Sequence, residues 1–315
     1  MGRARSFERT ATLWQLLALS DDELERTDLV ALNVAVAKEI PSLKDLDTER
    51  YCQIVDDWTE QFRRELPGRE RNFHATPEKL KNDIRFFRVG MLQMFLNKVI
   101  GIRYIEEQRN LKAVHYDNPS DLFINGLIDT KQGTCASMPV LHAAMCRRMG
   151  WPVSLASAKS HLFSRFDDGE VVHNIEVTST MPGSFGSPPD SHFIETSKLP
   201  PKARKGDLRK LTGRETAGAF VGLRARHYRD VKDMERADIS YSLSRVLFPT
   251  HRHTYIGAMN PMLWRGSQLF DRGEVGHPDS LFEVFAPRIL PQTFRVSMRP
   301  SDEIELTEPM FQNVT

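Results

Sequence analysis

No segment of this 315-residue sequence is a long hydrophobic run, and the chain contains only three cysteines. A membrane-spanning helix needs about 18 to 20 apolar residues, and neither such a stretch nor an apolar signal-like stretch near the N-terminus is present. We therefore expect no membrane partner. Cys52, Cys135 and Cys146 are too few and too widely spaced for a disulfide framework. Free thiols are typical of a reducing compartment, so a cytoplasmic location is predicted.

The sequence also lacks an excess of charge of either sign and a glycine-rich phosphate-binding loop. Lys and Arg total 43 whereas Asp and Glu total 42. Because nucleic-acid binding requires a basic surface, this balance indicates no nucleic-acid partner. Without a phosphate-binding loop a nucleotide-dependent activity has no support, and we expect no cofactor.

A metal site is the weaker interpretation of the cysteines and histidines. Cys135, His142 and Cys146 could share one helical stripe, with His161 as a fourth ligand. Zinc-binding cysteines usually occur as close pairs in a turn, and this spacing matches no common zinc arrangement. We therefore expect no metal, and interpret His142 and Cys146 as residues that pack within a helix.

Hydrophobic periodicity divides the chain into four regions. Residues 1–110 are predicted to be a helical N-terminal region, because apolar side chains recur there at three- and four-residue spacing. In residues 111–205 a helical pattern precedes alternating strand patterns, which predicts an α+β fold. Residues 206–250 contain two amphipathic stretches and are predicted to form a helical hairpin. Repeated prolines in residues 251–315 indicate an extended tail.

Local signals indicate where helices begin and end in the N-terminal region. Ser20 and Glu23 have the spacing of a capping box. An apolar stripe over residues 51–66 predicts a helix that stops before Pro67. Thr76-Pro77 predicts the start of the next helix, with Thr as N-cap and Pro at the first helical position.

The central region is predicted to contain a cysteine-bearing helix followed by strands. The helix runs from about Cys135 to Met149, but Pro139 requires either an unusual first turn or a regular helix that begins near Met138. Residues 180–205 are rich in Pro, Gly and Ser and are predicted to be an irregular covering loop. The predicted strands cover residues 153–156, 161–166 and 171–177.

Cys135 is the candidate nucleophile. It lies in Gly133-Thr134-Cys135-Ala136-Ser137-Met138-Pro139, at the entrance of a helix. A helix N-terminus and a nearby imidazolium both favour the thiolate, which is the reactive form of cysteine. His161 begins a strand, from which its ring can reach a helix terminus and transfer protons. The backbone N–H of Cys135 is the candidate oxyanion donor. The alternative is that Cys135 only fills space in a core.

The third member of the site is an acid or an amide on the next strand. Asn174 and Glu176 point to the same face of the strand, because side chains alternate between the faces. Either side chain could hold His161 in the required tautomer. We prefer Glu176 and keep Asn174 as the alternative. A hairpin whose polar face is only exposed to solvent would also produce this pattern.

Several segments of the central region together resemble a known family. They are similar to a bacterial branch of the transglutaminase-like superfamily whose members often have a helical lead-in and a tetratricopeptide-like C-terminal region. The segments that carry the resemblance are residues 122–128, 133–141, 147–152, 158–163 and 174–178. Residues 216–249 fit a fragment of a tetratricopeptide-like tail.

The resemblance implies a papain-like core in which a helix bearing the cysteine packs on a small antiparallel sheet. It implies Cys135 as nucleophile, His161 as general base and Glu176 as orienting group, with hydrolysis of amide bonds or acyl transfer through a thioester. Glu176 departs from the commoner Asp, and Leu162 stands where many relatives have an aromatic residue. A protein or peptide substrate is expected. The alternative is an inactive scaffold that binds a protein partner through the C-terminal helices.

Overall fold

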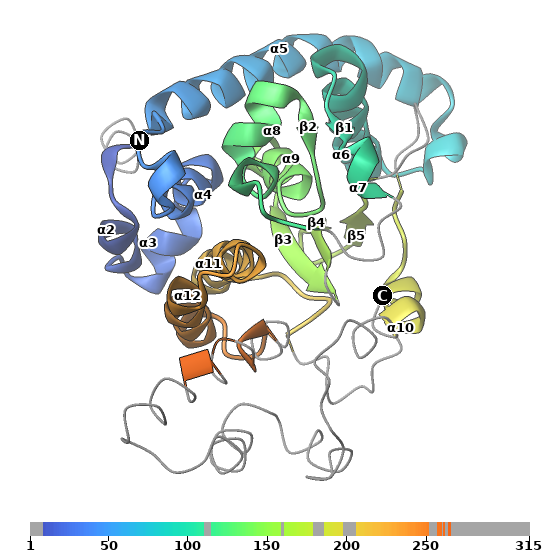
Figure 1. Cartoon of the computed structure of the whole chain (residues 1–315). Coiled ribbons are helices and arrows are strands. Elements are labelled where there is room, and N and C mark those ends of the chain that lie inside the picture. The colour runs from blue at the N-terminus through green and yellow to red at the C-terminus, as the bar shows by residue number, and fades with distance from the viewer. Residues whose placement is uncertain are drawn as a thin grey trace, which may run out of the picture.

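The fold of the chain is α+β, with many helices around a small antiparallel sheet (Figure 1). The structure is a computed structural model. It describes residues 9–109, 115–158, 161–178, 186–197, 206–251, 257–259, 261 and 264–265. The coarse fold class predicted from the sequence is therefore confirmed.

Helices make up the N-terminal region, and the long α5 arches over the central part of the molecule (Figure 1). Ser20 and Glu23 form the predicted capping box at the start of α3. The elements of this region are α2 (Leu13–Leu17), α3 (Asp21–Arg26), α4 (Leu29–Ala37), η1 (Pro41–Leu43), α5 (Thr48–Ala75), η2 (Pro77–Leu80), α6 (Ile84–Phe95), η3 (Leu96–Ile100) and α7 (Glu106–Arg109).

Two helix boundaries in this region differ from the prediction. Helix α5 continues through Pro67 to Ala75 instead of stopping before the proline. Pro67 is exposed, so water can reach the backbone carbonyl that loses its intrahelical partner there. The turn predicted to open a helix at Thr76-Pro77 is only the short 3₁₀ helix η2, and the next α-helix begins later, with Asp83 as its N-cap.

The central region contains the predicted helix and three antiparallel strands. The sheet order is β3-β4-β5, and a second, parallel pair joins β1 to β2. The order of strands along the chain and their positions confirm the pattern predicted for residues 153–177. The elements are β1 (Arg103–Tyr104), η4 (Pro119–Asp121), α8 (Ile124–Thr130), β2 (Gln132–Gly133), α9 (Met138–Arg148), β3 (Val153–Ala158), β4 (His161–Asp167) and β5 (Val172–Ile175).

Helix α9 lies at the centre of the molecule. Its side chains from Met138 to Cys146 are all buried, and it packs against α4, α5 and the sheet. The predicted hairpin is present as α11 (Gly213–Asp230) and α12 (Met234–Leu247). One hydrophobic cluster extends from Leu13 to Ala258 and includes residues of the hairpin. The four-region division stays a prediction, but packing between the regions is continuous.

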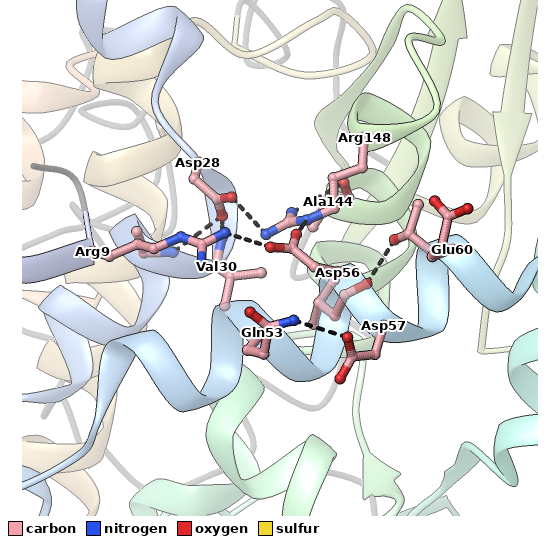
Figure 2. Close-up of polar contacts among 12 residues, drawn as sticks. Arg9, Asp28, Val30, Gln53, Asp56, Asp57, Glu60, Ala144 and Arg148 are labelled. Atoms are coloured by element: carbon pink, nitrogen blue, oxygen red, sulfur yellow. Dashed lines mark hydrogen bonds and ion pairs between the residues drawn. The ribbon is translucent and has the colours of Figure 1, made fainter. Parts of the chain in front are cut away.

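A buried ion-pair network fixes the C-terminal end of α9 to the N-terminal helices (Figure 2). The Arg148 guanidinium contacts Asp28, the N-cap of α4, at 2.5 Å, and Asp56 of α5 at 2.6 Å. Arg9 forms a further ion pair with Asp56. The Arg148 side chain is only 9% exposed, so this paired charge is held largely away from water. The network fixes the end of α9 opposite to Cys135.

The predicted covering loop at residues 180–205 contains a helix, α10 (Asp190–Ser197), which corrects that part of the prediction. Residues 179–185 and 198–205 lie outside the described residues. Most of the predicted extended tail, residues 251–315, also lies outside them, and the described residues at 257, 259, 261 and 264–265 are helical.

Candidate functional site

Cys135 lies in a tight turn immediately before α9. The Thr134 carbonyl accepts hydrogen bonds from the N–H groups of Ser137 and Met138, at 3.2 and 3.0 Å. The Thr134 hydroxyl accepts a third, from Ala136 N–H at 3.1 Å. The regular helix thus begins at Met138, the second of the two starts that Pro139 left open. The turn presents a half-buried Cys135 at the positive end of the helix.

Gly133 allows the chain to pass close to this turn. A Cβ atom at Gly133 would lie 2.6 Å from Ser137 Oγ and 2.7 Å from Leu127 Cδ1. Both distances are shorter than real Cβ contacts, so a larger residue here would displace the turn. The glycine two residues before Cys135 is therefore required by close packing.

His161 and Glu176 lie next to each other on one face of the sheet. His161 is the first residue of β4, as predicted, and Glu176 directly follows β5. The register that pairs Ser164 with Ile175 places both side chains on the same face. The His161 Nε2 lies 2.5 Å from Glu176 Oε2. The same imidazole is hydrogen-bonded to the Cys135 thiol, so one ring joins the cysteine to the carboxylate.

These contacts set the charges of the three groups. Burial raises the pKa of the Cys135 thiol, but the hydrogen bond with His161 and the His161 charge outweigh burial and hold that pKa below its ordinary value. Burial lowers the pKa of His161, whereas its hydrogen bonds with Cys135 and Glu176 raise it, with a net result of about 10. Burial also raises the pKa of Glu176, and the His161 contact reverses this to a lowered pKa. The arrangement favours a thiolate beside an imidazolium and a carboxylate.

The backbone and a neighbouring hydroxyl hold Glu176 in place. Its Oε1 accepts hydrogen bonds from the Thr178 N–H at 2.9 Å and from the Thr178 hydroxyl at 2.5 Å. Its own N–H donates to the Gly186 carbonyl at 2.9 Å. One carboxylate oxygen is therefore fixed by Thr178 while the other faces His161. Thr178 was not predicted as a site residue, since a threonine after a strand carries no distinguishing signal.

Asn174, the alternative orienting residue, contacts a different set of groups. Its amide oxygen accepts from Arg165 at 2.7 Å, and its amide nitrogen donates to Asp190 Oδ1 at 2.8 Å and to the Pro188 carbonyl at 3.0 Å. Arg165 also forms an ion pair with Asp190 at 2.9 Å. Asn174 thus ties α10 to the sheet, and Glu176, not Asn174, contacts His161.

Helix α10 covers the His161 ring from one side. Phe193 stacks on Phe163 with ring centroids 4.5 Å apart and an interplanar angle of 9°. The His161 ring lies nearly parallel to both phenyl rings, at 6.2 Å from each. These apolar neighbours restrict the ring and exclude water from its face. Phe193 has no sequence signal, because the Pro-, Gly- and Ser-rich segment around it predicts a loop.

Tyr116 and Arg226 complete the surroundings of Cys135. Tyr116 is 2% exposed, its hydroxyl is hydrogen-bonded with the Thr134 side chain, and it interacts electrostatically with Cys135. The Arg226 guanidinium of α11 lies 4.5 Å from the centroid of the Tyr116 ring and favours the Cys135 thiolate. Neither residue has a sequence signal, because both come from segments far from Cys135 along the chain.

The candidate oxyanion donor is the Cys135 N–H. No described residue accepts a hydrogen bond from it. It lies in the same turn as the thiol, so a carbonyl attacked by the sulfur would develop its negative charge close to this donor.

His142 and Cys146 lie inside α9 as packing residues, as expected. Both are fully buried, and His142 Nε2 lies 3.1 Å from the Val89 carbonyl. Burial lowers the pKa of His142 to about 4 and raises that of the Cys146 thiol. Within the described ranges, no group of three or more His, Cys, Asp or Glu side chains is placed to hold a metal ion.

No helix in the described part of the chain combines the length and apolar character that crossing a membrane requires. The chain was also compared with protein families, curated proteins and solved structures. No family model, curated protein or solved structure matches it.

Proposed function

We propose that the chain is a cysteine-dependent amide or peptide hydrolase or acyltransferase that acts through Cys135, His161 and Glu176. The observation that carries the proposal is the single imidazole ring hydrogen-bonded to both the thiol and a fixed carboxylate. A cysteine that only fills core space requires neither contact. The lowered pKa of Cys135 supplies thiolate, the attacking form of the side chain.

The chemistry follows from this geometry. The Cys135 thiolate attacks the carbonyl carbon of an amide, and the Cys135 N–H stabilises the oxygen that becomes negative. When the C–N bond breaks, the His161 imidazolium protonates the leaving amine, and a thioester remains on Cys135. His161, now neutral, removes a proton from water, which attacks the thioester and releases a carboxylic acid and the free thiol. An amine that replaces water at this step would give a new amide.

We also propose that the core is transglutaminase-like, with a protein or peptide as substrate. Two features support this: a helix that begins just after the cysteine packs on the sheet that carries the histidine and the acid, and the order of the three residues is that of the superfamily. Hydrolysis is the preferred outcome, because excluding water from a thioester demands a closed site. The three free cysteines accord with a reducing cytoplasm as its location.

Alkylation of Cys135 tests the catalytic assignment. We would measure the rate of iodoacetamide reaction from pH 4 to 10, with peptide mapping by mass spectrometry to separate the three thiols. Cys135 is expected to react with a midpoint below the ordinary thiol value, and His161→Ala to raise that midpoint. Cys52 and Cys146 serve as internal controls, because burial raises the pKa of both thiols, that of Cys52 to about 12.

His74→Ala, on the distant α5, is the matched control for loss of a histidine and should leave the midpoint unchanged. A Cys135 midpoint like that of an ordinary free thiol would exclude the catalytic assignment and favour the inactive scaffold. With a reactive thiol established, an acyl-donor probe should form a covalent adduct with the wild type and not with Cys135→Ala.

A further inference from the structure

Helix α11 of the C-terminal hairpin is attached directly to the segment that borders Cys135. His227 Nδ1 lies 2.8 Å from the Tyr116 carbonyl, and the Tyr116 N–H donates to Asp230 Oδ2 at 3.1 Å. Both backbone groups of Tyr116 are therefore held by side chains of α11. The hairpin, which the sequence suggests as a partner-binding element, also forms part of the wall around the nucleophile.

The Tyr116 side chain connects this wall to the cysteine turn. Its hydroxyl is hydrogen-bonded with the side chain of Thr134, the residue before Cys135. Arg226 lies over the face of the Tyr116 ring, with its guanidinium carbon 4.5 Å from the ring centroid. A planar guanidinium over an aromatic face is held in a defined orientation by cation–π attraction. Tyr116 is thus a platform that places a positive charge near the turn.

The charges around the thiol explain why such a cation is needed. In the reactive state, the Cys135 thiolate and the Glu176 carboxylate are negative, and the His161 imidazolium is positive. The three groups together carry one net negative charge in a largely buried site, which is unfavourable. Arg226 is a further cation that acts on the Cys135 thiol. Burial and the negative charge of Glu176 disfavour the Cys135 thiolate, whereas His161 favours it most strongly and Arg226 adds a smaller effect in the same direction.

We propose that Arg226, held over the Tyr116 ring, is a positioning residue that supplies the balancing positive charge for the Cys135 thiolate, and that α11 is therefore part of the catalytic unit. This inference rests on the proposed function. Other groups face the pair from neighbouring elements: Tyr104 of β1 faces Tyr116, while Tyr241 of α12 faces Arg226. Burial raises the pKa of Tyr116 and of Tyr241, so both phenols are neutral at the pH of the test.

The test is the pH midpoint of Cys135 alkylation by iodoacetamide in the full-length chain. Arg226→Gln removes the charge and is expected to raise the midpoint by about one pH unit, the order expected for one charge at an intermediate dielectric constant. Arg226→Lys retains the charge, so its midpoint should stay close to that of the wild type. Tyr116→Leu removes the platform and should raise the midpoint in the same direction, whereas Tyr116→Phe, which retains the ring, should change it less.

The matched control is Arg236→Gln on α12. Arg236 also lies over a tyrosine ring, that of Tyr228 at 5.8 Å, but it is not among the main charges that act on Cys135. If the role of Arg226 were only structural, Arg226→Gln would lower thermal stability without changing the pH midpoint of Cys135 alkylation. An unchanged midpoint in Arg226→Gln, with a lowered midpoint in the wild type, would overturn the role of Arg226 and leave the proposed function intact. An ordinary midpoint in the wild type would overturn both.

Discussion

The surroundings of two histidines near α9 shift their pKa values in opposite directions: that of His161 is raised and that of His142 is lowered. His142 provides the cleaner test of these shifts. Its ring is fully buried in α9 among apolar residues, and its polar partners are the Val89 carbonyl, 3.1 Å from Nε2, and the Cys146 sulfur, 3.9 Å from the ring nitrogens. Burial lowers its pKa from 6.5 to about 4, so the folded protein keeps this ring neutral over a range in which the unfolded chain protonates it. The contribution of His142 to stability is present above pH 6.5 and is lost as the pH falls toward 4.

The magnitude follows from the gap between the two pKa values. The gap is about 2.5 units, and each unit corresponds to about 1.4 kcal/mol. At pH 4 half of the folded molecules also bind the proton, so the net loss relative to pH 7 is about 3 kcal/mol. His142→Gln keeps an amide donor for the Val89 carbonyl and does not titrate. Its own cost in packing is the same at both pH values and cancels in the comparison.

The assay is urea unfolding of the wild type and His142→Gln at pH 7, 6, 5 and 4. The difference between their free energies of unfolding should change in favour of the variant by about 3 kcal/mol between pH 7 and pH 4. Removal from water also lowers the pKa of His251 to about 4, but His251 is present in both proteins and its effect cancels. A difference that stays constant over this range would refute the assignment of His142 as a neutral, buried packing residue.

Three further predictions concern the site and its support. Thiol-dependent activity should fall on the alkaline side near pH 10, where His161 loses its proton, as a pH–rate profile would show; an alkaline limit near pH 7 would contradict it. Glu176→Gln should lower the rate by about 10²-fold and move that limit to lower pH, whereas Asn174→Ala should leave the limit unchanged. Arg148→Met should cost about 3 kcal/mol of stability in urea unfolding, because Asp28 loses its ion pair and Asp56 keeps only Arg9 as a cationic partner. Arg236→Met, at the exposed ion pair with Asp233, should cost much less; equal costs would show that burial of the first network is unimportant.

Elements with a strong local pattern were predicted well. The strands beginning at Val153 and His161 and the two hairpin helices lie close to their predicted positions, because side-chain periodicity reports which face is buried. The prediction was wrong at Pro67 and at Thr76-Pro77, because the local restriction that proline imposes carries no information on exposure or packing. Helix α10 was missed because Pro, Gly and Ser in the surrounding segment concealed a short helix whose Phe193 packs on the sheet.

The candidate nucleophile, its histidine and the strands that follow can be identified from the sequence, because they depend on residue type and on periodicity over a few neighbours. The choice between Glu176 and Asn174 requires the folded arrangement, since both side chains point to the same face and differ in which distant groups reach them. The same holds for Tyr116 and Arg226, which come from separate segments and meet at Cys135 only when α11 packs against the core. Electrostatic contacts of this kind depend on distance in space, and that information is absent from spacing along the chain.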